Sequence, residues 1–236
     1  MPIRIYMPRQ ARIVIPNIPH HITQRGNRRQ NIFFSSYDRS FFLELLKHYS
    51  EKFSIDVIAY CLMTNHIHVV AVPGSSDSFH LAFKSIFRRY GSFKNTVAGW
   101  TGHFWQERFF SSPLDEGHFW TALRYVELNP VRAKMVAQAA DYRWSSARAH
   151  CNAECDMLLA RDSVWHRKLD RVSDWREFLS AATDHEINDA RERFCRSLPF
   201  GDESFVANLE QVTGRVLRVR PKGRPRKQPS ETVAGC

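Results

Sequence analysis

Two histidines that stand one residue apart, His66 and His68, have the type and spacing that most directly suggest chemistry in this chain. They lie in the run CLMTNHIHVV, Cys61 to Val70, which is apolar and rich in β-forming residues toward its end. Side chains at positions i and i+2 of a strand point to the same face. His66 and His68 would therefore project together, with Ile67 turned into the core behind them. Two such imidazoles can form half of a divalent metal site, although the same pattern also occurs in strands that bind no metal.

A tyrosine and an asparagine later in the chain are the second pair of candidates. A helix is predicted from Asp115, which we expect to be its N-cap. Tyr125 and Asn129 are four residues apart and share one face of this helix, and His118 falls near the same face two turns earlier. They flank an apolar stripe with i, i+3, i+4, i+7 spacing, formed by Phe119, Ala122, Leu123 and Val126.

These two pairs together suit phosphoryl transfer. A phenol has a pKa of about 10 and is a weak nucleophile unless the phosphate is activated. A divalent ion held by His66, His68 and the amide oxygen of Asn129 would polarise a phosphodiester, which Tyr125 could then attack to form a phosphotyrosine. Mixed nitrogen and oxygen ligation with open positions suits Mg²⁺ or Mn²⁺. The alternative for Tyr125 is a half-buried helix tyrosine with no chemical role.

The elements that must position these residues alternate in type along the chain. We predict a strand at 20–26, a helix after Asp38 as its cap, strands at 54–63 and 66–72, a helix at 79–90, a strand at 102–112 and the helix from Asp115, which Pro130 should end. The order β-α-β-β-α-β-α predicts an α+β fold, a ferredoxin-like antiparallel sheet with helices packed on one face, over residues 17–137.

The rest of the chain predicts three further segments around this core. Residues 1–16 form a basic N-terminal arm, 17–150 the candidate catalytic domain, and 151–213 a helical module with helices near 173–182, 185–196 and 202–212. Residues 214–236 are a basic tail that carries seven Lys and Arg residues between Arg215 and Lys227. This tail is too polar and rich in proline to fold alone.

The composition narrows the class of partner. A net charge of +10 and a pI of about 9.7 favour a polyanion, with nucleic acid ahead of a membrane surface because no basic amphipathic helix stands out. No apolar run is long enough to span a bilayer, and the N-terminus has no signal-peptide pattern. Five cysteines with irregular spacing favour a reduced cytoplasmic, nucleoid-associated protein, and Cys151 and Cys155 beside His150 lack the second pair of a zinc site.

Four motifs occur in an order that resembles the REP-associated tyrosine transposases: IPHHITQRGNRRQNIFF, AYCLMTNHIHVVAVP, GHFWQERFFSSPLDE and RYVELNPVRAKMV. This family belongs with the single-tyrosine insertion-sequence transposases to the HUH (His-hydrophobic-His) nucleases, and the resemblance covers residues 8–150. It implies that His66 and His68 are metal ligands, that Asn129 is the third ligand, and that Tyr125 becomes 5′-linked to DNA. It also implies a ferredoxin-like fold and a single-stranded DNA hairpin, or palindromic repeat, as substrate. Thr64 stands where the family commonly has proline.

Basic and amide side chains near these motifs are the predicted DNA contacts. Arg and Lys bind phosphates, whereas Arg, Asn or Gln can read bases. The candidates in the folded part are Arg25, Asn27, Arg28, Arg29, Arg88, Arg89, Gln106 and Arg108. Trp105 and Phe109 could stack unpaired bases, or could belong to the core.

The tail segment KGRPRK, Lys222 to Lys227, resembles an AT-hook that would place Arg224 and Arg226 in the minor groove of A·T-rich duplex DNA. The alternative is a solvated basic tail with non-specific affinity. For the whole protein three hypotheses remain: a DNA-nicking and strand-transfer enzyme, a domesticated non-catalytic hairpin-binding regulator, and a phosphoesterase that uses water. The sequence leaves monomer and homodimer both open.

Overall fold

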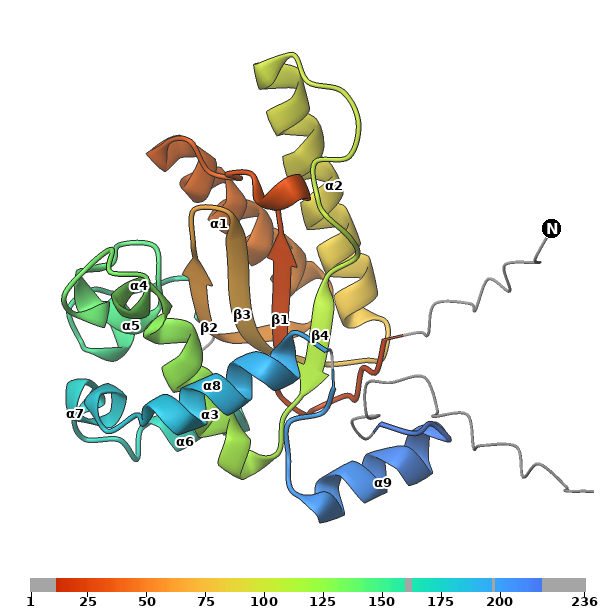
Figure 1. Cartoon of the computed structure of the whole chain (residues 1–236), viewed down its shortest axis with the longest axis vertical. Coiled ribbons are helices and arrows are strands. Elements are labelled where there is room, and N and C mark those ends of the chain that lie inside the picture. Colours follow the sequence, from red (N-terminus) through yellow and green to blue (C-terminus); the bar gives the residue numbers. More distant parts are fainter. Residues whose placement is uncertain (1–11, 160–162, 197, 218–236) are drawn as a thin grey trace, which may run out of the picture.

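A four-stranded antiparallel sheet forms the centre of the molecule. The computed structural model describes residues 12–159, 163–196 and 198–217. The strands lie in the order β2-β3-β1-β4, and each pairs antiparallel with its neighbours (Figure 1). They are β1 (His20–Arg25), β2 (Ile55–Leu62), β3 (His66–Pro73) and β4 (Phe110–Pro113). This order and the intervening helices confirm the predicted ferredoxin-like α+β fold.

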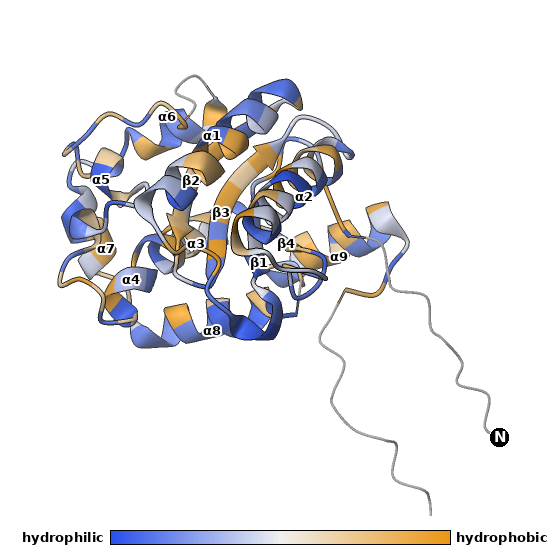
Figure 2. Cartoon of the chain, turned by 90° about the horizontal axis from the view of Figure 1, so that it is seen from above, coloured by the Kyte–Doolittle hydropathy of each residue, from blue (hydrophilic) through white to orange (hydrophobic). Residues whose placement is uncertain are grey.

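Helices cover both faces of the sheet, which corrects the prediction that they pack on one face. α1 (Ser36–Lys52) and α2 (Ser78–Ala98) share a core with Ile67 and Val69 of β3. α3 (Glu116–Glu127) lies on the opposite face, with Val70 and Val72 (Figure 2). The apolar run at the end of β3 is continuous because a strand that is buried on both faces has no polar alternate positions.

The β2–β3 hairpin places the two histidines at the start of β3. The strands pair from Ile55 opposite Pro73 to Leu62 opposite Ile67, and a turn at 63–65 joins them. The backbone amides of Ile32 and Phe33 donate to the carbonyl of Thr64 at 2.9 and 3.3 Å. The turn is therefore held by the segment that precedes α1.

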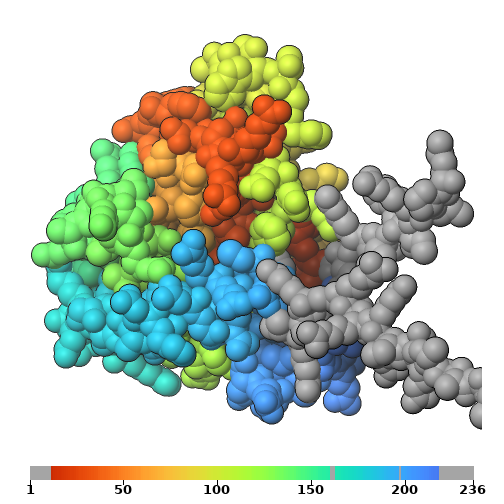
Figure 3. Space-filling model, in the orientation of Figure 1, coloured from red at the N-terminus to blue at the C-terminus, as the bar shows by residue number. Residues whose placement is uncertain are grey.

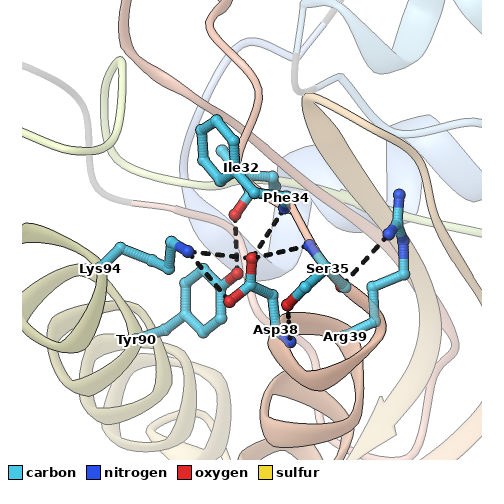
Figure 4. Close-up of polar contacts among 7 residues, drawn as sticks. All are labelled: Ile32, Phe34, Ser35, Asp38, Arg39, Tyr90 and Lys94. Carbon is cyan, nitrogen blue, oxygen red and sulfur yellow. Dashed lines mark hydrogen bonds and ion pairs between the residues drawn. The ribbon is translucent and has the colours of Figure 1, made fainter. Parts of the chain in front are cut away.

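α1 begins at a capping box in which Asp38 has a different place from the one predicted. Ser35 is the N-cap, and Asp38 is the third residue of the helix, accepting from the backbone amides of Phe34 and Ser35 at 2.7 and 3.1 Å. Both carboxylate oxygens of Asp38 also accept from Lys94 of α2 at 2.9 Å (Figure 4). The hydroxyl of Tyr90 donates to the carbonyl of Ile32 at 2.6 Å. These contacts join α1 and α2 to the segment that holds the hairpin turn.

The remaining elements follow the sequence closely, with two corrections. β4 is shorter than the predicted strand at 102–112, because residues 102–109 form only an isolated bridge between Gly26 and Trp105. α3 ends at Glu127, ahead of Pro130 as predicted, and α6 was not predicted. The other helical elements are η1 (Asn27–Arg29), α4 (Asn129–Arg132), η2 (Ala139–Asp141), α5 (Ala147–His150), α6 (Val164–Leu169), α7 (Trp175–Ser180), α8 (Asp184–Phe194) and α9 (Glu203–Thr213).

A buried glutamate ties α3 to the C-terminal helices. Glu127 accepts from Ser146 at 2.5 Å, from Trp175 at 2.6 Å, and pairs with Nδ1 of His150 at 2.6 Å. α7, α8 and α9 correspond to the three helices predicted after residue 172, and α8 packs along α3 (Figure 1). Within the described residues, no helix has the length and apolarity needed to cross a bilayer.

Candidate active site

His66 and His68 project from β3 to the face that α3 covers, as the strand spacing predicts. Their ring centroids lie 4.8 Å apart, and Ile67 between them enters the core on the other face. In the sheet, His66 lies opposite Arg25 and His68 opposite Thr23, both on β1. The backbone of His68 is paired on both sides, with β1 and β2, whereas that of His66, at the start of β3, is paired with β1.

The ring nitrogens of both histidines are oriented by partners on the protein side. Nδ1 of His66 donates to Oδ1 of Asn65 at 2.6 Å, so its Nε2 carries the lone pair of the neutral ring. Nδ1 of His68 lies 2.8 Å from Nε2 of His21, and Nε2 of His68 is buried without a hydrogen-bond partner. A ligating histidine is commonly held through its other nitrogen in this way, which leaves Nε2 for a metal.

All three imidazoles are neutral at neutral pH, the form that binds a metal. Burial, with the nearby charge of Arg25, lowers the pKa of His66 to about 4. Burial, with the neighbouring His66, lowers the pKa of His21 to about 3. Burial and the charges of the surrounding rings hold the pKa of His68 well below its ordinary value.

Tyr125 of α3 packs against His68 of this histidine pair. Its ring is 5.3 Å from that of His68 and nearly perpendicular to it, at 88°. The side chain is only 6% exposed. Burial raises the pKa of Tyr125 above its ordinary value, and the charges of Arg132, Arg191 and Arg25 act in the opposite direction.

Asn129 follows Tyr125 by one helical turn, at the start of α4. Its Nδ2 donates to the carbonyl of Tyr125 at 2.7 Å. Since the amide nitrogen is used in this bond, the amide oxygen remains as the free end of the side chain, and Asn129 lines the same cavity as His66, His68 and Tyr125. The structure thus brings together the four residues predicted to carry the chemistry.

The fifth candidate, His118, lies on α3 but outside this cavity. Its Nδ1 pairs with Asp115 at 2.7 Å, and its ring packs against Phe200. Asp115 is the N-cap of α3, as predicted, because its side chain accepts from the amide of His118. His118 therefore serves the start of the helix, two turns away from Tyr125.

A loop after β1 closes the site on one side. The amide of Gly26 donates to the carbonyl of Asn65 at 3.0 Å, and Nδ2 of Asn65 donates to the carbonyl of Arg29 at 3.1 Å. A Cβ atom on Gly26 would lie 2.5 Å from the carbonyl oxygen of Gln30, so only glycine fits this close approach. The same asparagine therefore orients His66 and anchors the basic loop.

These elements surround a cavity of about 560 Å³. Segments from the N-terminal quarter of the chain and from α8 adjoin on one face of the molecule (Figure 3). Besides the four candidate residues, the lining comprises Thr23, Gln24, Arg25, Arg29, Met63, Gln106, Glu107, Phe110, Arg132, Ala133, Arg191, Phe194 and Cys195.

The residues present fit a divalent metal with an incomplete protein shell. The unpartnered Nε2 of His68 and the oriented ring of His66 supply two nitrogens, and Asn129 could supply an oxygen. In the described part of the chain, no group of three or more His, Cys, Asp or Glu side chains is arranged to hold a metal. A metal here would therefore need the amide of Asn129, and a substrate oxygen or water, to fill its shell.

The predicted DNA contacts divide between two surfaces. Arg25, Arg29 and Gln106 line the central cavity. Arg88, Gln106 and Arg108 line a second, more open groove of about 530 Å³ between α2 and residues 102–108. The two surfaces adjoin at Gln106 and Glu107, which line both.

Other predicted contacts have structural partners or lie outside the described residues. Asn27 donates to the carbonyl of His103 at 3.0 Å, and Arg89 donates to the hydroxyl of Tyr49 at 3.1 Å. Arg28 is exposed, with a left-handed φ of 51°. Arg224 and Arg226 fall outside the residues described.

The two aromatic residues proposed for base stacking are not alike. Phe109 is buried in the core beside α2, which supports the structural alternative for this residue. Trp105 donates through Nε1 to the carbonyl of Phe87 at 2.7 Å and still borders the groove.

Three features of the site were not predicted from sequence: His21, Arg132 and the contact of α8 with the cavity. His21 lies on β1 two residues before Thr23, whose strand partner is His68, so it reaches the site through the pairing of β1 with β3, which was not predicted. Phe194 of α8 stacks on His21 at 3.8 Å between ring centroids. No motif marks this helix, because its relation to the site depends on how it packs against α3.

Comparison with known proteins identifies a family and a similar fold for this chain. Residues 14–129, about half of the chain, match the family described as IS200-like transposases. The structure is similar to that of a REP-associated tyrosine transposase bound to a REP hairpin, with a TM-score of 0.50 and 18% identity, covering 67% of this chain and 93% of that one. A proposed transposase from Deinococcus radiodurans aligns with a TM-score of 0.36 and 15% identity, over 53% of this chain and 91% of that one. No curated protein matches the chain.

The fold and the site define a ferredoxin-like α+β protein in which a strand histidine pair faces a helix tyrosine. The chain belongs to the family of IS200-like transposases. The matched region contains β3 with His66 and His68 and α3 with Tyr125, and it ends at Asn129, the first residue of α4.

Proposed function

We propose that this protein nicks single-stranded hairpin DNA and transfers the cut strand through a covalent 5′-phosphotyrosine at Tyr125. The observation that carries the proposal is the position of Tyr125, whose ring stands 5.3 Å from that of His68 in a cavity shared with His66 and Asn129. A tyrosine with only a packing role would not require two oriented imidazoles in the same cavity.

The step can be written with the atoms of Tyr125 and one phosphodiester. The phenol loses its proton, and its oxygen attacks phosphorus. The bond from phosphorus to the 3′ oxygen of the preceding nucleotide breaks, and this oxygen takes up a proton to become a free 3′ hydroxyl. The 5′ phosphate stays on Tyr125, so a second 3′ hydroxyl can reverse the step and rejoin the strand.

We propose Mg²⁺ or Mn²⁺ as the cofactor, held by His66, His68 and Asn129. When bound, the ion supplies positive charge to the phosphate oxygens. His21 and Asn65 orient the two imidazoles. Arg25 and Arg29 line the cavity and would bind the phosphates of the DNA backbone. α3 brings the phenol to the same cavity.

A hairpin is the substrate that the comparisons favour. The structurally similar transposase is bound to a REP hairpin, and this chain carries a net charge of +10. The central cavity is joined at Gln106 to an open groove that borders Arg88 and Arg108. We therefore propose that paired DNA contacts the groove while the unpaired strand enters the cavity.

A labelled-oligonucleotide assay tests the reaction. A hairpin with single-stranded flanks is incubated with the protein and Mg²⁺ or Mn²⁺, and the products are separated on a denaturing gel. A label at the 3′ end of the DNA should migrate with the protein, whereas a label at the 5′ end should leave with the released strand. Tyr125→Phe should form no adduct. Tyr37→Phe is the matched control, since Tyr37 is an exposed tyrosine of α1.

Each alternative hypothesis predicts a different gel. An adduct that retains the 5′ label would reject a 5′ linkage. Cleavage that persists in Tyr125→Phe, with no adduct in the unsubstituted protein, would support attack by water. Hairpin binding that is unaffected by loss of His66, His68 and Tyr125, with no cleavage of any flanked hairpin, would support the non-catalytic regulator.

A further inference from the structure

One wall of the active-site cavity comes from α8, a helix that lies outside the family-matched region. Arg191, Phe194 and Cys195 line the cavity together with His66, His68 and Tyr125. The match to IS200-like transposases ends at Asn129, more than fifty residues before this helix. α8 is thus a part of this chain that reaches the site without belonging to the shared domain.

α8 is held rigidly enough to place a side chain. Its N-terminus is fixed by a capping box between Thr183 and Glu186. Ile187, Ala190 and Phe194 are buried at helical spacing, and the helix packs on α3 (Figure 1). Besides its stack on His21, the Phe194 ring meets that of Tyr125 edge-on at 5.2 Å. Arg191 follows the buried Ala190 directly, so it stands at the edge of this packed stripe, where the helix borders the cavity.

Arg191 differs from the arginines that follow it on this segment because it has no acidic partner among the described residues. Arg193 pairs with Asp189, and Arg196 pairs with Glu192, each with an acid one turn earlier. One turn before Arg191 stands Ile187, and Arg191 forms no ion pair with any of the described residues. Its guanidinium is therefore available to an anion in the cavity.

Arg132 of α4 reinforces this charge from the tyrosine's own side. It donates to the side-chain oxygen of Asn188 on α8 at 3.2 Å, and this partner is neutral. With Arg25 and Arg29, four arginines line the cavity against a single acid, Glu107. Such an excess of positive charge around a buried phenol suits a phosphate rather than a neutral ligand.

We propose that Arg191, with Arg132 beside it, binds the DNA phosphate that Tyr125 attacks, so that α8 completes the active site. The inference rests on the proposed function and adds a phosphate-binding role for the C-terminal helices. The arginines form and break no covalent bond. They neutralise the charge on the non-bridging oxygens, which grows as the phenol oxygen reaches phosphorus, and they hold the phosphate in place after transfer to Tyr125.

The test compares variants that remove one arginine charge each, at Arg191 on α8 and at Arg196, two residues after the last residue of this helix. Arg191→Gln should slow adduct formation on the flanked hairpin about 10- to 100-fold, the effect of losing one hydrogen bond to a charged group. Arg196→Gln is the control, because Arg196 is exposed and paired with Glu192, and its effect should stay within about twofold. Arg191→Lys should recover part of the rate. Circular dichroism and thermal unfolding should match among the three variants.

A neutral phosphate separates a role at phosphorus from a role in folding. With a methylphosphonate at the scissile position, one charged oxygen is replaced by a methyl group, and the difference between Arg191→Gln and the unsubstituted protein should largely disappear. The inference is overturned if Arg191→Gln and Arg196→Gln slow the reaction equally, or if the Arg191→Gln defect persists on the methylphosphonate. If the unsubstituted protein forms adduct that Tyr125→Phe abolishes, either result rejects the role of Arg191 alone and leaves the proposed function standing.

Discussion

Replacing Lys94 by Met should destabilise the fold strongly, although Lys94 lies outside the candidate site. Lys94 and Asp38 form a buried ion pair between α2 and α1, with side chains that are 6% and 4% exposed (Figure 4). Removing one partner of a buried pair leaves an uncompensated charge, which costs about 3–5 kcal/mol. In Lys94→Met, Asp38 keeps its two backbone amide donors, so we expect the free energy of unfolding to fall by about 3 kcal/mol, the lower end of this range.

Replacing the other partner, Asp38, by Asn should lower the free energy of unfolding further. In Asp38→Asn, the new side-chain oxygen can still accept from the amides of Phe34 and Ser35, but the NH₂ group then faces the ammonium of Lys94. This places a donor against a buried cation, so we expect the free energy of unfolding to fall by about 5 kcal/mol. The double variant removes both charges and should cost less than the sum of the two single changes.

Urea unfolding followed by circular dichroism measures these free energies. Lys47→Met is the matched control, since Lys47 pairs with Glu51 on the exposed face of α1, and its loss should cost about 0.5 kcal/mol or less. If Lys94→Met costs no more than this control, or if the two single changes add fully in the double variant, the argument from burial is refuted.

The same pair predicts a dependence on acid. Burial alone would raise the pKa of Asp38, but the hydrogen bonds from Lys94, Phe34 and Ser35 outweigh it, so the pKa lies below its ordinary value of 3.8. A depressed carboxyl pKa contributes stability that is present above the unfolded pKa and is lost as the pH falls through the folded one. Below about pH 4, the unfolding free energy of the double variant should therefore fall less steeply than that of the unsubstituted protein.

Three further predictions concern the site and the tail. His21→Phe keeps an aromatic ring but removes the partner of His68, so Mn²⁺ affinity measured by calorimetry should fall about 10- to 100-fold, and an unchanged affinity would reject the orienting role. Gly26→Ala places a carbon 2.5 Å from a backbone oxygen, so the unfolding free energy in urea should fall by about 1–3 kcal/mol, and no change would show that the loop moves freely. Alanine at Arg224 and Arg226 should abolish a preference for A·T-rich over G·C-rich duplex in a binding titration, whereas an equal loss on both would favour the solvated tail.

The chemistry on β3 and α3 could be predicted because its signals are local. The i, i+2 spacing of His66 and His68 sets their common face, and the i, i+4 spacing of Tyr125 and Asn129 sets theirs. Local signals also set the start of α3 at Asp115. The histidine pair and the Tyr125–Asn129 pair come together only because α3 packs across the sheet. The spacing in the sequence did not predict this packing; it is seen in the structure.

The parts that escaped prediction depend on packing between distant segments. His21 reaches His68 because β1 and β3 pair in one register, and Phe194 reaches His21 because α8 packs on α3. The predicted one-sided sheet was wrong for a similar reason. The run Val69 to Val72 shows burial, but it does not show that two separate cores receive alternate side chains.

The register of β3 therefore determines where the site can form. Ile67 and Val69 point to the core under α1 and α2, whereas His66 and His68 point to the face under α3. A slip of one residue would exchange these sets, burying two imidazoles in an apolar core and turning Ile67 toward the tyrosine. Thr23 opposes such a slip, because its hydroxyl donates to the carbonyl of Ile67 at 2.8 Å in addition to the strand pairing. The alternation of apolar and histidine residues thus couples correct strand pairing to assembly of the site, so loss of the register would remove the chemistry and the core together.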